Sequence, residues 1–198
     1  MIYRYMFQGF CVSEDIRVKE NNEVTNLSLS VFNNKILMYF ESENSNINPE
    51  DIVNENMIPY PDGKLWEQMM DIFHYSKPLS NEHWKRKIEN KKPIFQVIYL
   101  KPEMVSSYIF YHYQYQEERP GEYDKYGAIF IYGNLLVMYL ETPEEKETEH
   151  YASKLSTKNT PTNWGKLMAE HFAPWEDFEG EWRGIKTITN YEVDKNDI

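Results

Sequence analysis

Tyr39 and Glu41 stand two residues apart in an apolar run, and Tyr139 and Glu141 repeat this spacing 100 residues later. Side chains two apart along a β-strand lie on the same face of the sheet. A phenol beside a carboxylate can donate, accept and transfer protons, which is the chemistry of a general acid-base site. We therefore take Glu41 and Glu141 as candidate proton carriers, with Tyr39 and Tyr139 as candidate ligand-binding residues. The alternative is that each glutamate occupies the solvated end of its strand.

His112 is the third candidate proton carrier. It lies in the run from Tyr108 to Gln114, which is rich in tyrosine and reads as a strand. In a strand, His112 would share a face with Tyr108, Phe110 and Gln114. The alternative interpretation is a core histidine that is satisfied by a hydrogen bond.

Trp66 and Trp164 are candidate walls for a ligand, because indole rings provide large apolar surfaces. Both are equally expected as packing residues between helix and sheet. No set of His, Cys or carboxylate residues has the spacing of a metal site, and no glycine-rich phosphate loop is present. We expect neither a metal ion nor a cofactor, and we expect the single cysteine, Cys11, to be a buried strand residue.

The elements that must position these residues are revealed by an internal repeat. The run Asn34–Glu41 aligns without a gap with Asn134–Glu141, at an offset of 100. Asn33-Asn34 and Gly133-Asn134 tolerate positive φ and predict a hairpin turn in each half.

Other segments extend the repeat at offsets of 94 to 103. Tyr5–Phe10 and Tyr108–Tyr113 read as first strands, and Ile94–Tyr99 and Ile188–Val193 read as closing strands. Apolar residues at helical spacing predict a second helix in each half, formed by Trp66, Met69, Met70 and Phe73 in the first and by Trp164, Leu167, Met168 and His171 in the second.

Each half therefore reads as strand, short irregular or helical segment, hairpin, helix, strand, which is the ferredoxin-like order β-α-β-β-α-β. We predict an α+β protein with two ferredoxin-like repeats, at residues 1–101 and 105–198. Two such sheets in one chain would form an internal pseudodimer similar to a dimeric α/β-barrel.

The formal net charge of -11 disfavours nucleic acid and anionic membrane surfaces as partners, because both attract clustered Lys and Arg. No apolar run approaches the length of a spanning helix, and the N-terminus lacks the pattern of a signal peptide. We expect a cytoplasmic protein that is monomeric, apart from its internal pseudodimer.

The segments Lys64–Phe73, Leu37–Glu41 and Phe95–Leu100 resemble the second-helix and strand motifs of the L-rhamnose mutarotase family. Val137–Glu141 and Trp164 resemble them in the second half. The resemblance implies a dimeric α/β-barrel fold that interconverts sugar anomers without a cofactor. The family carries a first helix with a catalytic histidine between strands one and two. Here the corresponding spans, 12–25 and 116–126, are too short for that helix, so a tandem version lacking it is expected.

Three classes of function follow. The first is a sugar mutarotase, with Glu41, Glu141 and His112 as proton carriers and Tyr39, Tyr139, Trp66 and Trp164 as the binding wall. The second is a small-molecule-binding or structural protein without catalysis. The third is a monooxygenase of the dimeric α/β-barrel type, or a haem-degrading relative.

Overall fold

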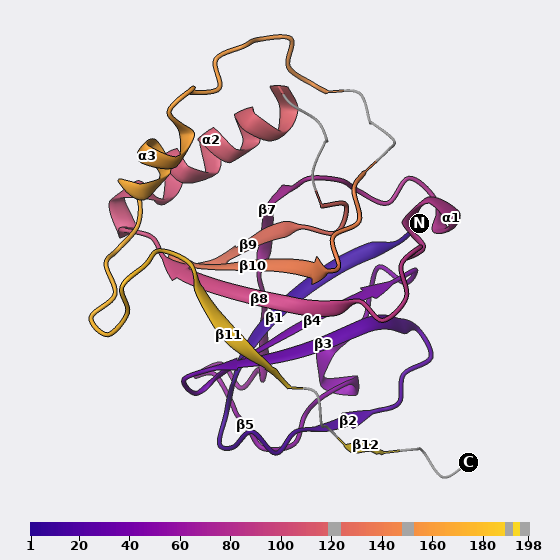
Figure 1. The fold of residues 1–198 in the computed structure, drawn as a ribbon. Coiled ribbons are helices and arrows are strands. Elements are labelled where there is room, and N and C mark those ends of the chain that lie inside the picture. The colour runs from indigo at the N-terminus through magenta and orange to yellow at the C-terminus, as the bar shows by residue number, and fades with distance from the viewer. Residues whose placement is uncertain (119–123, 148–152, 189–191, 195–198) are drawn as a thin grey trace. The chain divides into compact units, whose positions relative to one another are not determined.

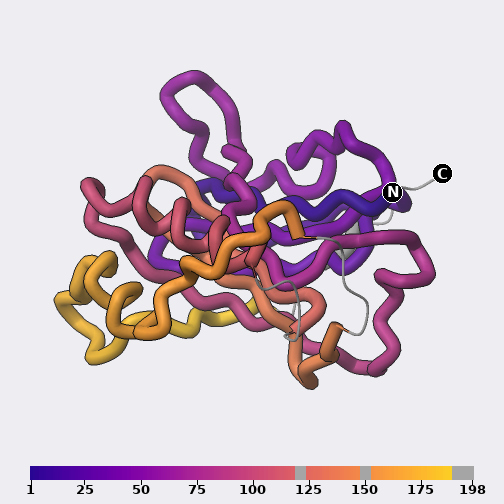
Figure 2. The backbone as a smooth tube through the Cα atoms, turned by 90° about the horizontal axis from the view of Figure 1, so that it is seen from above, coloured from indigo at the N-terminus to yellow at the C-terminus, as the bar shows by residue number. Residues whose placement is uncertain are grey.

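The fold is mixed α+β, with mostly antiparallel strands and few helices. A computed structural model describes residues 1–118, 124–147, 153–188 and 192–194, and the remaining residues are drawn in grey (Figures 1 and 2). The chain forms two compact units. Unit 1 comprises Met1–Met69, Pro78–Lys85 and Ile185–Ile198, and unit 2 comprises Met70–Lys77 and Arg86–Gly184.

Unit 1 is built around strand β4, which pairs antiparallel with β1 on one edge and β3 on the other. The far edge of β1 pairs with the short strands β5 and β6, and β3 pairs with β11. A separate ribbon joins β2 and β12 in parallel. The bounds are β1 Tyr3–Cys11, β2 Arg17–Lys19, β3 Val24–Phe32, β4 Lys35–Ser42, β5 Met57–Ile58, β6 Trp66–Gln68, β11 Arg183–Ile188 and β12 Glu192–Asp194, with the turns η1 Pro49–Asp51 and α1 Asn81–Trp84.

Unit 2 is built around β10 in the same way. Strand β10 pairs antiparallel with β8 and β9, and β9 pairs on its other edge with β7. Helices α2 and α3 lie along one side of these strands (Figure 1). The bounds are β7 Met70–His74, β8 Lys92–Tyr99, η2 Pro102–Met104, α2 Val105–Glu118, β9 Ala128–Tyr132, β10 Leu135–Thr142 and α3 Trp164–Ala169.

The two predicted hairpins are confirmed, and their registers match at the offset of 100. In β3 and β4, Leu29 lies opposite Met38, and in β9 and β10, Ile129 lies opposite Met138. The turn residues Asn33 and Gly133 have φ values of 56° and 59°. Asparagine and glycine are the residues that adopt this left-handed conformation most readily. This preference explains why both turns form at the predicted positions.

The predicted strand Tyr108–Tyr113 is wrong, because these residues belong to helix α2. Pro102 begins the preceding turn, where its missing N–H costs no hydrogen bond. Tyr108 and His112, four residues apart, are buried on one face of the helix, whereas Phe110 is 60% exposed. Burial of this face outweighs the strand preference of the aromatic residues. The expected absence of a helix before the second hairpin is therefore also wrong, since α2 lies between β8 and β9.

The predicted helix with Trp66, Met69, Met70 and Phe73 is also wrong. This segment forms β6 and β7, which pair with β1 and β9. Short apolar runs fit either element, and here two neighbouring strands supply the backbone hydrogen bonds. By contrast, the predicted helix at Trp164 is confirmed as α3.

The predicted strands Tyr5–Phe10 and Ile94–Tyr99 are confirmed as parts of β1 and β8. However, β8 pairs with β10 in unit 2, whereas we expected it to close the first repeat. Of the last predicted strand, Ile188 ends β11 and Glu192 begins β12, and residues 189–191 lie outside the described ranges.

Each unit has its own apolar core. In unit 1 the core lies around β1 and β4 and includes Phe7, Met38, Phe40 and Cys11, which is buried as predicted. In unit 2 it joins the strands to α2 and α3 through residues such as Ile98, Leu136, Tyr108 and Met168. Among the described residues, no helix is both long and apolar enough to cross a membrane.

Candidate functional site

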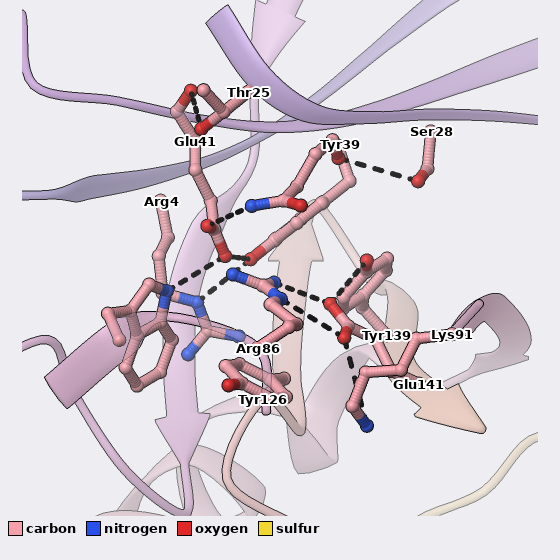
Figure 3. A network of polar contacts seen from close by, with 12 residues as sticks. Arg4, Thr25, Ser28, Tyr39, Glu41, Arg86, Lys91, Tyr126, Tyr139 and Glu141 are labelled. Carbon is pink, nitrogen blue, oxygen red and sulfur yellow. Dashed lines mark hydrogen bonds and ion pairs between the residues drawn. The ribbon is translucent and has the colours of Figure 1, made fainter. Parts of the chain in front are cut away.

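The carboxylate of Glu41 is buried at the centre of a polar cluster in unit 1 (Figure 3). Its Oε1 accepts hydrogen bonds from the hydroxyl of Tyr39 at 2.7 Å and from Nε1 of Trp84 at 2.9 Å. Its Oε2 accepts one from Nδ2 of Asn26 at 2.7 Å. Arg4 in turn donates from Nε to the hydroxyl of Tyr39 at 3.1 Å. Each of these donors stabilises a negative charge that burial would otherwise penalise.

Glu141 has an equivalent partner in unit 2, since Tyr139 donates to its Oε1 at 3.0 Å. Arg86 adds a two-point contact, with Nε 3.2 Å from Oε2 and Nη2 bonded to Oε1. The guanidinium of Arg86 also stacks over Tyr126, 3.9 Å from the ring centre. Nζ of Lys91 lies 4.0 Å from Oε2 (Figure 3). Glu141 is thus held by two cations and a phenol.

The prediction that each tyrosine shares a face with its glutamate is confirmed by these two hydrogen bonds. The alternative, glutamates at solvated strand ends, is wrong, since the two residues are only 1% and 6% exposed. Both carboxylates are fixed by several donors within their own unit.

Glu141 also lines a cavity of about 340 Å³ together with Asp124. Burial raises the pKa of Asp124 above its ordinary value, and hydrogen bonds from the backbone N–H groups of Tyr126 and Glu141 partly oppose this. A carboxyl group with a raised pKa beside a paired carboxylate is one arrangement that acid-base catalysis can use.

Trp66 lies in the core of unit 1. Its Nε1 donates to the carbonyl of Val53 at 2.8 Å, and the residue is 4% exposed. Its ring packs against Gly9, where a Cβ atom would lie 3.2 Å from the indole. Trp66 therefore packs between strands of unit 1. It is not among the described residues that line the cavities of unit 2.

His112 and Trp164 do come together, in an aromatic cavity of about 300 Å³ in unit 2. Their ring centres lie 5.0 Å apart, and His112 also stacks on Tyr108 at 4.0 Å. The cavity is bounded by β7, β9 and β10, by helices α2 and α3, and by the segment before β11. Its walls include the rings of Phe73, Tyr75, Tyr108, Tyr115, Trp164 and Trp182.

Two polar atoms on buried residues of this aromatic cavity make no hydrogen bond within the described residues. Nδ1 of His112 donates to the carbonyl of Tyr108 at 3.0 Å, which leaves Nε2 as a lone-pair acceptor without a donor. The hydroxyl of Tyr108 is also without a partner there. In the described chain only Oε1 of Gln8 is both fully buried and unsatisfied, so these two atoms must retain access to the cavity.

Both groups have fixed protonation states near neutral pH. Burial lowers the pKa of His112 to about 4, although the hydrogen bond to the Tyr108 carbonyl opposes this, and nearby His171 adds to the decrease. Burial raises the pKa of Tyr108 well above its ordinary value, and the charges of Tyr75 and Glu181 contribute. The cavity therefore offers a neutral acceptor beside a neutral hydroxyl donor.

The sequence candidates thus fall into separate groups. Glu41, Tyr39 and Trp66 lie in unit 1, Glu141 and Tyr139 lie at the Asp124 cavity, and His112 and Trp164 share the aromatic cavity. The sequence analysis placed Tyr108 on the face of His112 without naming it as a site residue, and it did not identify Glu181. Residues four apart share a face in a strand and in a helix, so a helical reading would have kept Tyr108 beside His112 and moved Phe110 to another face.

Comparison of the chain with protein-family models, with curated proteins and with solved structures found no match. The resemblance to L-rhamnose mutarotases therefore stays a prediction. Within the described ranges, no group of three or more His, Cys, Asp or Glu side chains is arranged to hold a metal ion.

Proposed function

We propose that this protein binds a small organic molecule in the aromatic cavity of unit 2. The observation that carries the proposal is the pair of polar atoms, Tyr108 Oη and His112 Nε2, that face the cavity from buried residues and have no partner among the described residues. A polar atom that faces a cavity is satisfied only by a partner inside that cavity, so this pair favours a ligand or ordered water there.

The dimensions of the cavity support a small ligand, and its walls combine aromatic rings with polar groups. A volume of about 300 Å³ is at the low end of the usual range for ligand sites. The ring contacts between Phe73, His112, Tyr115 and Trp164 fix the walls without a ligand. One hydroxyl group on the ligand would satisfy both polar atoms, since a hydroxyl can accept from Tyr108 and donate to His112.

Saturation-transfer NMR on the full chain, with a panel of small sugars, alcohols, ring compounds and amines, tests this proposal. We expect at least one compound to bind, and Tyr108→Phe to weaken its binding roughly tenfold by removing the donor. Tyr132→Phe is the matched control, because Tyr132 is exposed at the end of β9. The proposal fails if no compound binds, or if Tyr108→Phe binds as tightly as the parent.

A second candidate function is the interconversion of sugar anomers at the Asp124 and Glu141 cavity. It is favoured by a carboxyl group with a raised pKa beside a carboxylate that Arg86 keeps paired. Ring opening requires protonation of the ring oxygen and removal of the hydroxyl proton, and such a pair can supply both steps. The resemblance to L-rhamnose mutarotases adds to this candidate.

Anomer exchange measured by NMR on a panel of sugars tests the second candidate. We expect exchange above the buffer rate, and a loss of roughly a hundredfold in Asp124→Asn and Glu141→Gln. Glu144→Gln, at the rim of the same cavity, is the control. Exchange at the buffer rate for every sugar would exclude this function.

The same resemblance bears on a finer description of the fold. We infer that the second half of the chain derives from a ferredoxin-like element order that begins with β8 in unit 2 and ends with β11, most of which belongs to unit 1. The elements β8, α2, β9, β10, α3 and β11 follow one another as β-α-β-β-α-β, and β10 lies between β8 and β9. In unit 1, β4 lies between β1 and β3 in the same way, without a helix between β1 and β3. This correspondence supports an internal duplication of the three central strands.

A further inference from the structure

We infer that the ligand of the aromatic cavity is an organic ammonium cation, and that its head group is surrounded by the rings of unit 2. This inference rests on the proposed binding function and specifies the chemical class of ligand. It is carried by the composition of the cavity walls, which among the described residues combine many aromatic rings with one carboxylate, that of Glu181.

The faces of aromatic rings carry negative electrostatic potential, so a cage of rings attracts a cation. Trp164, Trp182, Tyr115 and Phe73 all line the cavity, and Trp is the strongest of these binders. Quaternary ammonium groups suit such a cage because their methyl groups are apolar and their charge is spread over a large surface.

The charges around the cavity have the sign that a cation requires. Glu181 lines the cavity, and its negative charge acts on the hydroxyl of Tyr108. Among the described residues of the lining, none is Lys or Arg. His112 is the remaining basic side chain there, and it is neutral at physiological pH because burial lowers its pKa. A bound cation would therefore meet no like charge in the walls.

A polyhydroxylated sugar fits these walls less well. Each sugar hydroxyl that enters an apolar site needs a hydrogen-bond partner, or its desolvation is not compensated. In the described lining, half-buried positions add the polar groups of Tyr75, Tyr115, Trp164 and Trp182. The polar side chains of this described lining that are themselves buried are Tyr108 and His112, whose Oη and Nε2 are enough for one hydroxyl. An ammonium head group with a single hydroxyl satisfies both the rings and these two atoms.

Two probes that differ only in charge test this inference. Choline carries a quaternary nitrogen and one hydroxyl. In its neutral isostere, 3,3-dimethyl-1-butanol (dimethylbutanol below), a carbon atom replaces that nitrogen. We expect choline to bind the full chain more tightly, by roughly 3- to 30-fold, because cation-π attraction is lost in the neutral probe. Isothermal calorimetry or NMR titration measures both affinities.

Substitution of the carboxylate gives a second measurement. Glu181→Gln should weaken choline by roughly two- to fivefold, since Glu181 is exposed, and should leave dimethylbutanol unchanged. Glu179→Gln, two residues away and outside the described lining, should change neither probe. Trp164→Leu should reduce the preference for choline, whereas Trp175→Leu should retain it, because Trp175 does not line the cavity in the described structure.

The outcomes separate this inference from the binding function. Equal or tighter binding of dimethylbutanol overturns the ammonium assignment and leaves a neutral ligand. If neither probe binds while a neutral sugar or alcohol binds at Tyr108, the ammonium assignment is overturned and the binding function stands. If nothing in the panel binds, both are overturned.

Discussion

Tyr39 donates a 2.7 Å hydrogen bond to Glu41, and Tyr139, 100 residues further along the chain, donates one of 3.0 Å to Glu141. The two tyrosines also occupy equivalent registers, since Tyr39 pairs with Ser28 and Tyr139 with Ala128. The repeat in the sequence therefore preserves an interaction as well as a strand. In both units this hydrogen bond fixes a carboxylate that is buried from solvent.

Tyr39→Phe should destabilise the protein because it removes one donor from the buried Glu41. We expect the free energy of unfolding to fall by about 1–3 kcal/mol, the usual cost of leaving a buried acceptor short of a partner. Urea denaturation followed by tryptophan fluorescence measures the change. Tyr3→Phe is the control, because Tyr3 lies on the same sheet and is 38% exposed. Equal effects of the two substitutions would contradict the role given to Tyr39.

Arg86→Met should be more damaging than Tyr39→Phe, because it leaves the buried Glu141 without its bidentate partner. Breaking one side of a buried ion pair typically costs about 3–5 kcal/mol. The double variant Arg86→Met with Glu141→Gln should recover part of this loss, since no carboxylate then remains unpaired. A double-mutant cycle of denaturation midpoints measures the coupling, and strictly additive effects would argue against it.

The hairpins and the Tyr-Glu hydrogen bonds could be predicted because local chemistry determines them. A residue that tolerates positive φ fixes each turn, and once the turn is set, the two-residue period of a strand decides which side chains share a face. The contact between Tyr39 and Glu41 could therefore be predicted from their own strand alone.

The aromatic cavity could not be predicted, because it depends on packing between distant segments. Tyr108 and His112 meet Phe73 and Trp164 only once α2 has packed on the strands of unit 2. The run that forms α2 is rich in tyrosine and phenylalanine, so propensity favours a strand, and its tertiary contacts reverse that preference. Trp66 was similarly ambiguous, because its segment has helical spacing but pairs with β1.

Gly9→Ala should test the close approach of β1 and β6 in unit 1. A Cβ atom at Gly9 would lie 2.7 Å from the carbonyl oxygen of Leu65 and 2.5 Å from Cε of Met57. The methionine can move, but the backbone carbonyl is fixed by the sheet, so we expect a loss of about 1–3 kcal/mol in stability.

The matched control for Gly9→Ala is Gly165→Ala in helix α3. A Cβ atom there would contact nothing within 4 Å, and alanine is the better helix former, so stability should rise by up to ~1 kcal/mol. Opposite signs in thermal denaturation are the expected result. A neutral Gly9→Ala would show that the strands can separate at no cost.

Acidification should destabilise the protein through His112. Burial holds the pKa of His112 at about 4 in the folded state, whereas the unfolded chain has the ordinary value of 6.5. Between these values the unfolded state binds more protons, so stability falls as the pH is lowered from 6.5 towards 4, by on the order of 3 kcal/mol. Above pH 6.5 both states are neutral at this residue and its contribution is constant.

Urea denaturation at pH 7.5, 5.5 and 4.5 measures this dependence, and His112→Gln isolates the part due to the imidazole. Glutamine cannot gain a proton, so the variant should lose less stability than the parent over the same range. The carboxylates titrate in both proteins and largely cancel in the difference. NMR titration of the His112 ring should show a midpoint near 4. A midpoint near 6.5 would place the ring in water, and it would also remove the argument that the cavity stays free of positive charge.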